Sequence, residues 1–399
     1  MKIPSNFQFL TQDPFSVSIF ALTIMQAATH YRIMICPLDW GLGHATRCIP
    51  LIRELQDAGA CVVIAADGPQ LKLLRTEFPE AEWIVFGGYR VRYGKKTDAA
   101  CRILIDTPRL FYMILKEHFK LKSLIKEHRI DGVISDNRYG LWNRNIRTVF
   151  ITHQLNIIAP PRLKFTEPFL RAATRFFAGR FDECWIPDSE NEDNLSGKLS
   201  HGFSIPENTF FVGLLSRFDR QVKGNTNLKY DVIAIVSGPE PQRSIFAGKL
   251  SEKLPSANKK CLIILGIPGE TTISNLRENL DTANHLTSDQ LYDILMTKPV
   301  VISRAGYSTL MDIAFTGNKA ILIATPGQTE QEYLASSLRE KGRYYSSRQD
   351  DLRLDEAIRI LEDSGSTTPL TPSVLYPAFI SRFLESIPKP DGKNRRVAP

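Results

Sequence analysis

The amino-acid sequence predicts an α/β protein built from two Rossmann-like domains that face each other across a cleft. Three observations support this fold class. The first half of the chain alternates short apolar runs with helical segments, a polar stretch at 216–228 interrupts the pattern, and the alternation restarts at 229. Alternation at this spacing is typical of a parallel, doubly wound sheet. A chain of 399 residues is long enough for two such domains.

The expected elements follow from β-branched runs for strands and from apolar residues at helical spacing for helices. The first half contains predicted strands at 32–36, 61–65, 83–86, 132–135, 148–152, 183–186 and 209–212, and predicted helices at 45–57, 69–78, 108–128 and 168–178. The second half contains predicted strands at 231–236, 261–265, 300–303 and 320–324, and predicted helices at 241–253, 287–297, 307–316, 329–340, 352–362 and 373–386.

The domain boundaries are set by this pattern. We expect a first domain at 31–215, a linker at 216–228, a second domain at 229–365, and a C-terminal helix with a basic tail at 366–399. Residues 1–30 are expected to form a poorly ordered extension. The apolar run at 15–28 is too short to span a bilayer, and a cleaved signal segment is the alternative.

Composition limits the class of partner. The apolar content of 43% and charged content of 23% are those of a globular protein. The formal net charge of +7 favours an anionic partner such as a nucleotide diphosphate or an anionic lipid. No recognised nucleic-acid motif is present, so we expect no nucleic acid. The six cysteines are scattered without a CxxC pair, which fits a reducing cytoplasm.

The segment 300–335 carries the clearest candidate site. A short strand is followed by Gly306 and then by a helix that begins with Tyr307, Ser308 and Thr309. A helix that begins directly after a strand presents free backbone N–H groups, which suit a diphosphate. Asp312, one turn further along, could accept hydrogen bonds from the hydroxyls of an attached ribose. The alternative is an ordinary β-α-β unit with a glycine turn.

The loop and helix after the next predicted strand add polar groups. Gln328 and Gln331, with Glu330 between them, offer amides and acceptors to sugar hydroxyls. The order SRAG (303–306), helix acid, Pro–Gly loop and QEY (331–333) resembles the donor-sugar signature of the MurG-like glycosyltransferases, family 28, which have the GT-B fold. The resemblance implies that the second domain binds a UDP-sugar, with Arg304 and Gly306 in its motif.

Three further segments are similar to elements of that family. VGLLSR (212–217) resembles the element that closes the first domain, which implies that Arg217 could clamp a donor phosphate. VSGPEPQR (236–243) stands where relatives have a glycine-rich phosphate loop, which implies that Ser237 and Gly238 could contact phosphate. Leu286 lies where relatives hold the uracil edge through backbone groups.

The loop WGLGHATR (40–47) follows the first predicted strand. Ligands bind at the carboxyl ends of strands in open α/β sheets, so we expect this loop to face the cleft. Gly43 permits close backbone approach, and His44 lies at a helix N-terminus, where the dipole disfavours the charged imidazole. His44 is therefore a candidate base, and the alternative is a histidine that only fills space in the turn.

The same loop is also similar to the GxGHxxRC pattern of the UDP-sugar hydrolase of pseudaminic acid synthesis, another GT-B protein. Gly41, Gly43, His44, Arg47 and Cys48 match that pattern. The resemblance implies a catalytic histidine at position 44, and it leaves transfer and hydrolysis both open.

Two other strand ends carry polar residues. Asp136 ends one predicted strand and is a second candidate catalytic residue, the alternative being a carboxylate that satisfies local amides. THQLN (152–156) ends the next strand, where MurG-like proteins carry HEQN. No glutamate separates His153 from Gln154, so the acceptor of those proteins does not transfer to this chain.

Two stretches, 102–129 and 162–181, mix aromatic and apolar residues with Lys and Arg at helical spacing. Such stretches lie at a membrane interface or cover a sheet with a solvated basic face. The first reading predicts a cytoplasmic protein with peripheral contact at the inner face of the membrane.

Three functions remain open. The first is transfer of a sugar, an N-acetylhexosamine on the strength of the resemblance, from a UDP-sugar to a hydroxyl acceptor that is lipid-linked or part of a cell-envelope glycan. The second is hydrolysis of a nucleotide sugar, with His44 activating water. The third is a sensor that binds a nucleotide sugar without turnover. No DxD-type metal motif is apparent, and no cofactor beyond the donor substrate is expected.

Overall fold

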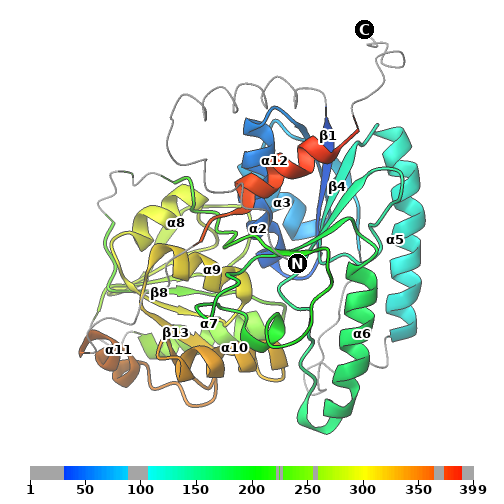
Figure 1. Cartoon of the computed structure of the whole chain (residues 1–399). Coiled ribbons are helices and arrows are strands. Elements are labelled where there is room, and N and C mark those ends of the chain that lie inside the picture. Colours follow the sequence, from blue (N-terminus) through cyan, green and yellow to red (C-terminus); the bar gives the residue numbers. More distant parts are fainter. Residues whose placement is uncertain are drawn as a thin grey trace, which may run out of the picture.

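The structure is a computed structural model that describes residues 31–88, 107–221, 224, 228–254, 259–363 and 373–388. The predicted extension at 1–30 and the basic tail at 389–399 lie outside the described residues. Two seven-stranded sheets with flanking helices form the molecule (Figure 1). The predicted α/β fold class is confirmed.

The first sheet is entirely parallel and has the order β3-β2-β1-β4-β5-β6-β7. Its strands are β1 Arg32–Pro37, β2 Cys61–Ala66, β3 Glu82–Val85, β4 Gly132–Asp136, β5 Arg147–Ile151, β6 Glu183–Ile186 and β7 Thr209–Phe211. Its flanking segments are α2 Leu42–Asp57, α3 Gly68–Glu77, α5 Thr107–Glu127, α6 Glu167–Ala178 and the 3₁₀ turns η2 Pro161–Thr166 and η3 Gly197–Leu199.

Both faces of this sheet are buried. On β1, Ile33 and Ile35 pack into one apolar cluster, whereas Met34 and Cys36 pack into another. Successive side chains of a strand point to opposite faces, so the two clusters lie on the two sides of the sheet. Burial on both sides explains why the strands are continuous apolar runs rather than alternating ones.

The second sheet has the order β10-β11-β9-β8-β12-β13-β14, and only the β10–β11 pair is antiparallel. Its strands are β8 Val232–Ile235, β9 Cys261–Ile264, β10 Ile273–Arg277, β11 Leu280–Ala283, β12 Val300–Ser303, β13 Ala320–Ile323 and β14 Tyr345–Ser347. Its helices are α7 Gln242–Lys253, α8 Ser288–Leu295, α9 Tyr307–Thr316, α10 Thr329–Glu340 and α11 Leu354–Asp363.

Three of these strands, β10, β11 and β14, were not predicted from the sequence. β10 and β14 are edge strands, and four of the five residues of β10 are exposed. Each of these two strands packs one apolar residue against the core, Ile273 in β10 and Tyr345 in β14, so neither shows an apolar run or alternation. The β10–β11 hairpin turns at Asn279, whose φ of 58° is in the left-handed region that Asn tolerates.

The strand order reverses at one position in each sheet, and these positions locate the site. In the first sheet, β2 and β4 lie on either side of β1. The strands β1 to β3 are therefore added in one direction, and β4 to β7 are added in the opposite direction. In the second sheet, β9 and β12 lie on either side of β8 in the same manner. Crevices that bind ligands form at the carboxyl ends of strands at such switch points.

The end of the described chain returns to the first sheet. Helix α12, Tyr376–Ser386, lies beside α2 and β1, far from α11, which precedes it in the sequence (Figure 1). Tyr376 and Phe383 are almost completely buried, and Phe383 meets the ring of Trp185 edge-on. The second half is therefore connected to the first at two places, after β7 and before α12.

The first residues of the predicted linker are part of the core. Ser216, Arg217 and Phe218 are all buried, and Arg217 is 9% exposed. Ser216 and Arg217 form hydrogen bonds with Asp312 of the second half, and these bonds permit the burial of a polar segment. None of the helices in the described ranges has the length and apolarity needed to cross a membrane.

Candidate active site

His44 and Asp136 lie together at the switch point of the first sheet. Pro37 at the end of β1 pairs with Asp136 at the end of β4, and α2 begins five residues after Pro37. This brings the Nδ1 atom of His44 to 3.0 Å from Oδ2 of Asp136. The carboxylate is completely buried, and its two oxygens contact only His44, Arg47 and the thiol of Cys48 among the described residues.

Helix α2 begins three residues earlier than predicted. Gly41 has a φ of 76°, in the left-handed region, and this turns the chain directly into the helix at Leu42. Gly43 and His44 therefore lie in the first helical turn rather than in a loop before it. His44 and Arg47, which are three residues apart, consequently share one helix face.

The charges around His44 favour its neutral form. Burial and the Arg47 guanidinium lower the pKa of His44, and they outweigh the opposite effect of Asp136. Burial by itself would raise the pKa of Asp136, but the positive neighbours Arg47 and His44 hold it below its usual range. The pair is therefore a neutral imidazole beside an ionised carboxylate at neutral pH. Within the described residues, Nε2 of His44 has no hydrogen-bond partner.

The predicted donor residues lie at the switch point of the second sheet. Ser237 and Gly238 follow β8, and Gly306 to Thr309 follow β12, the strand that pairs with β8. Gly306 is the N-cap of α9, and a Cβ atom there would meet nothing within 4 Å. Gly238 has a φ of 106° and is equally open. These two turns lie at one switch point, where the N-terminus of α9 presents backbone N–H groups of the kind that bind anions.

The two switch points are in contact. The hydroxyl of Ser308 donates to the carbonyl oxygen of Gly43 at 2.7 Å. Tyr307 donates its hydroxyl proton to the carbonyl oxygen of Pro187 and stacks on the ring of His153, with 4.0 Å between the ring centres. The first turn of α2 and the first turn of α9 therefore face each other, with His44 one residue from the contact.

Asp312 and Arg217 form an ion pair that joins the halves at the segment after β7. Arg217 Nε donates to Oδ2 of Asp312 at 3.1 Å, and Ser216 Oγ and Arg217 N donate to Oδ1 at 2.8 and 3.3 Å. Burial raises the pKa of Asp312, although Arg217 and Ser216 act in the opposite direction. Both carboxylate oxygens already have protein partners, so a ribose would have to share or replace them.

Of the remaining predicted donor residues, Gln328 is partly accessible, whereas Gln331, Leu286 and Arg304 have structural contacts within the second half. Gln328 is the N-cap of α10 and is half-buried. Gln331 accepts from the backbone N–H of Thr325 through Oε1, and Leu286 is buried just before α8. Arg304 is 1% exposed and donates to carbonyl oxygens of Ala324 and Gln242, so it ties β13 to α7. Burial lowers the pKa of Arg304 to about 10.

Three residues that complete the site were not predicted to act on His44. Arg47 bonds to Asp136 and to Nδ1 of His153, and His153 Nε2 lies 2.8 Å from Oε1 of Glu330 on α10. Arg47 and His153 were noted only as motif residues and Glu330 only as a sugar acceptor. The signal available for Arg47 was its spacing of three residues from His44.

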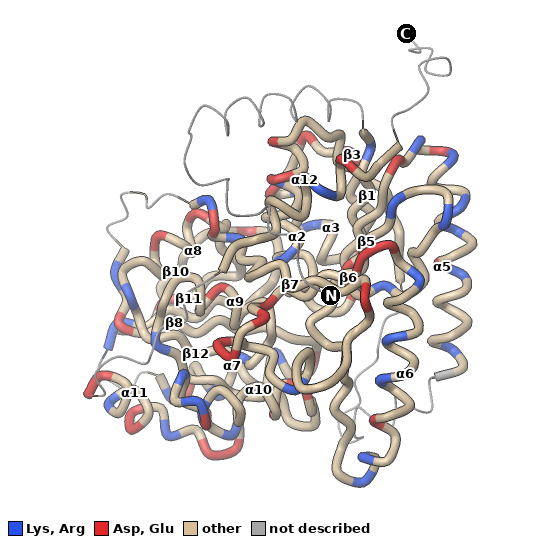
Figure 2. Tube along the Cα trace, viewed as in Figure 1, with Lys and Arg blue, Asp and Glu red and all other residues tan. Residues whose placement is uncertain are grey.

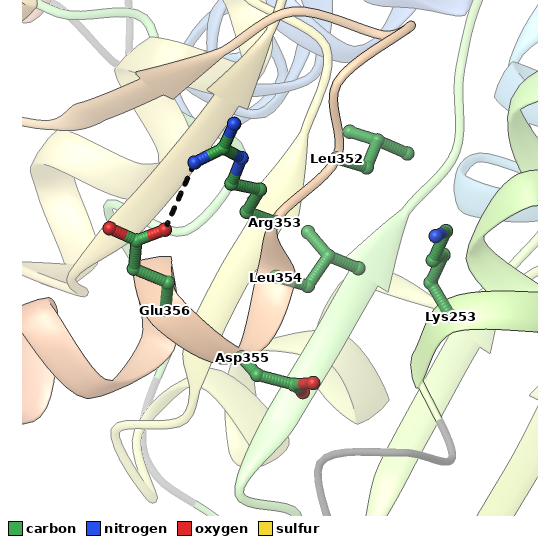
Figure 3. A pocket seen from close by; sticks show the side chains of 6 residues that line it. All are labelled: Lys253, Leu352, Arg353, Leu354, Asp355 and Glu356. Carbon is green, nitrogen blue, oxygen red and sulfur yellow. Dashed lines mark ion pairs between the residues drawn. The ribbon is translucent and has the colours of Figure 1, made fainter.

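No group of three His, Cys, Asp or Glu side chains in the described ranges is arranged to hold a metal ion. A pocket lined by Lys253, Leu352, Arg353, Leu354, Asp355 and Glu356 lies at the far end of the second sheet, beside α11 (Figure 3). It contains none of the residues of either switch point.

Residues 248–372 match the C-terminal domain of glycosyltransferase family 28. The chain is also 25% identical over 363 residues to an uncharacterized glycosyltransferase of Methanosarcina acetivorans, with 84% of this chain and 89% of that protein covered. The chain has the GT-B fold, and its second half is similar to the nucleotide-sugar-binding half of family 28 glycosyltransferases. The matched region contains the α9 and α10 surfaces, whereas His44 and Asp136 lie outside it.

Solved structures agree on the fold. The glycosyltransferase of kitacinnamycin superposes with a TM-score of 0.57 at 16% identity, covering 89% of this chain and 95% of that chain. The glycosyltransferase SsfS6 of Streptomyces sp. SF2575, complexed with thymidine diphosphate, superposes with a TM-score of 0.52 at 14% identity, covering 90% and 97%. These likenesses confirm the predicted pair of facing Rossmann-like domains.

Proposed function

We propose that this glycosyltransferase moves an N-acetylhexosamine from a UDP-sugar to a hydroxyl group of a lipid-linked or cell-envelope glycan, with His44 as the base. The observation that carries the proposal is the contact of Ser308 with Gly43. This contact places a half-buried, neutral histidine next to a helix N-terminus suited to a diphosphate. The proposed proton acceptor belongs to the first half of the chain and the proposed leaving-group site to the second, and the two meet where Ser308 contacts Gly43.

The reaction uses these groups in fixed roles. The acceptor oxygen forms a bond to the anomeric carbon of the sugar while its proton passes to Nε2 of His44. The bond between the anomeric carbon and the diphosphate oxygen breaks, and its electron pair stays on the diphosphate. The N–H groups at the start of α9 stabilise that charge. Arg217 adds a positive charge to the leaving group when it exchanges Asp312 for a donor phosphate. Asp136 holds the imidazole through Nδ1 and does not itself reach the acceptor.

The donor is tested by thermal stabilisation. Incubating the protein with UDP, thymidine diphosphate and UDP-sugars should raise the melting temperature most for the true donor class, because only the folded protein binds it. We expect UDP-N-acetylhexosamines to stabilise more than thymidine diphosphate. Equal or absent shifts for all nucleotides would contradict the proposed donor.

Hydrolysis is the second candidate, favoured by the match of Gly41, Gly43, His44, Arg47 and Cys48 to the hydrolase pattern. The two reactions differ in whether an acceptor is needed. Stoichiometric release of UDP and free sugar from the stabilising donor, in the absence of any acceptor, would establish hydrolysis. A donor that stays intact until a glycan acceptor is added would establish transfer.

We further propose that the acceptor is reached at an anionic membrane surface through α5 and α6. Exposed aromatic residues occur on both helices and on the turn before α6, and Lys and Arg lie among them (Figure 2). Trp142 joins the two helices, since His118 of α5 stacks on it and Arg180 after α6 lies over both Trp142 and Phe176. Apolar rings surrounded by basic side chains are the composition of interfacial helices. The exposed rings are Phe111, Tyr112, Phe119, Phe165, Phe169 and Phe176.

Replacing Phe165 and Phe169 by serine should abolish sedimentation with vesicles of phosphatidylcholine and phosphatidylglycerol. These two rings are 70% and 75% exposed, so their loss removes buried apolar area only in the membrane-bound state. Serine at Ile245 and Leu276, exposed apolar residues of the second half, is the matched control and should leave sedimentation unchanged. Failure of the wild-type protein to sediment with these vesicles, or equal loss in the control, would contradict the proposal.

A further inference from the structure

A buried guanidinium lies between two histidines of the first half, His44 and His153. Arg47 is 2% exposed, and its Nε donates to Asp136 at 2.9 Å while one terminal nitrogen lies 3.0 Å from Nδ1 of His153. The other terminal nitrogen bonds to Asp136 and lies 2.9 Å from Nδ1 of His44. An arginine side chain can only donate hydrogen bonds, so any atom that forms a hydrogen bond with Arg47 must be the acceptor.

This rule fixes the tautomer of His153. Since Arg47 can only donate, Nδ1 of His153 must accept, and the ring proton of the neutral imidazole is then on Nε2. Nε2 lies 2.8 Å from Oε1 of Glu330, to which it donates. Burial alone would raise the pKa of Glu330, but His153, His44 and Arg47 lower it, so the acceptor is a carboxylate. The ring of Tyr307 covers one face of this imidazole.

The same rule restricts His44. Its Nδ1 cannot donate to Asp136 and accept from Arg47 at once. The Arg47 nitrogen near His44 also bonds to Asp136, and a carboxylate is a stronger acceptor than an imidazole. Nδ1 of His44 therefore carries the proton and donates to Asp136, which leaves Nε2 unprotonated. Asp136 thus limits His44 to the tautomer that the proposed reaction requires, and Arg47 acts on this pair by holding the carboxylate in place.

We propose that Arg47 is a positioning residue that fixes the orientation and proton uptake of His44, and that His153, held by Glu330 from the second half, anchors Arg47 in that place. This inference deepens the proposed function, because it assigns the groups that prepare its base. Neither residue touches substrate in this account; each acts on His44.

The charges that face His44 determine the sign of the expected effect. They are Arg47 from the same helix, Asp136 from β4, His153 after β5 and Glu330 from α10. The Arg47 charge opposes protonation of His44, whereas the two carboxylates favour it. The pKa of His44 is lowered in the folded protein, so activity should fall only as the pH drops below that lowered value. Loss of the Arg47 charge should raise the pKa and move this fall to higher pH.

The test is an NMR titration of the histidine rings in the whole protein, labelled with ¹³C-histidine. The His44 signal is assigned by its loss in His44→Gln. We expect Arg47→Gln to raise the midpoint of the His44 titration by about one pH unit or more, because a charge within contact distance has been removed. His153→Ala should raise it in the same direction. His153→Asn keeps an acceptor where Nδ1 stood, so it should stay near the wild-type midpoint.

Because Arg47→Gln by itself could unfold the protein, the same substitution is also made in a second variant. Arg47→Gln leaves Asp136 buried without its main partner, which is destabilising. In Asp136→Asn protein the buried carboxylate that pairs with Arg47 is absent, and adding Arg47→Gln there should again raise the midpoint of His44. An unchanged or lower midpoint on removing Arg47 in either folded background would overturn the proposal. The titration needs no substrate, so its outcome is independent of whether the proposed sugar transfer is correct.

Discussion

Replacing His44 by glutamine is expected to lower kcat of sugar transfer by about 10²- to 10⁴-fold, the usual contribution of a general base. Glutamine has nearly the same reach and can still donate to Asp136, but its amide cannot take a proton from the acceptor. Oδ2 of Asp136 lies 3.0 Å from Nδ1 of His44, so the carboxylate keeps a partner in the variant. The fall should therefore appear in turnover, measured by UDP release, and not in folding.

The donor affinity separates this explanation from a general loss of the site. Titration calorimetry with UDP should give the same dissociation constant for His44→Gln and the wild type, because the proposed diphosphate site is on α9. His128→Gln is a control of the same chemistry, since His128 pairs with Glu82 at the opposite edge of the first sheet. Full activity of His44→Gln, or equal loss in His128→Gln, would contradict the assignment.

The second large effect is expected at Asp312, on stability. Asp312→Ala removes the acceptor of Ser216 Oγ and leaves the Arg217 guanidinium buried without its carboxylate. Breaking a buried ion pair by removing one partner costs about 3–5 kcal/mol, so the free energy of unfolding should fall by that amount. Denaturant titration followed by fluorescence measures it.

Asp312→Asn distinguishes the structural role of this residue from the predicted ribose contact. Asparagine can still accept from Ser216 and Arg217, so its loss of stability should be smaller than that of alanine. If Asp312 also binds ribose, the well-folded asparagine variant should bind UDP more weakly than the wild type. Wild-type stability of Asp312→Ala would contradict the structural role, and wild-type UDP affinity of Asp312→Asn would contradict the ribose contact.

The sequence predicted the buried strands well because their signal is local. Val300–Ser303 and Glu183–Ile186 were predicted with their observed bounds, since a strand buried on both faces must be a continuous apolar run. The hairpin of β10 and β11 was missed because its outer strand is exposed. The start of α2 was placed three residues late because the left-handed turn at Gly41 depends on a backbone angle that the sequence does not reveal.

The candidate site was predicted in parts. His44 and Asp136 were selected separately, each as a polar residue after a strand, and topology made them neighbours because β1 pairs with β4. The His153–Glu330 contact joins residues 177 positions apart, and no local pattern relates them. The packing of α12 against the first sheet could not be predicted either. The sequence of a helix reveals its apolar face, but not the surface against which that face packs.

The sequence by itself determined the two Rossmann-like domains, the strand ends that carry polar residues, and the glycine turn that opens α9. These features depend on residues close together in the chain, whose spacing sets backbone conformation and burial. The tertiary structure alone decided that Arg47 lies between His44 and His153, that Glu330 meets His153 across the boundary, and that Asp312 pairs with Arg217. Charges acquire partners only when distant segments are packed together, and burial then gives those pairings their effect on pKa and stability.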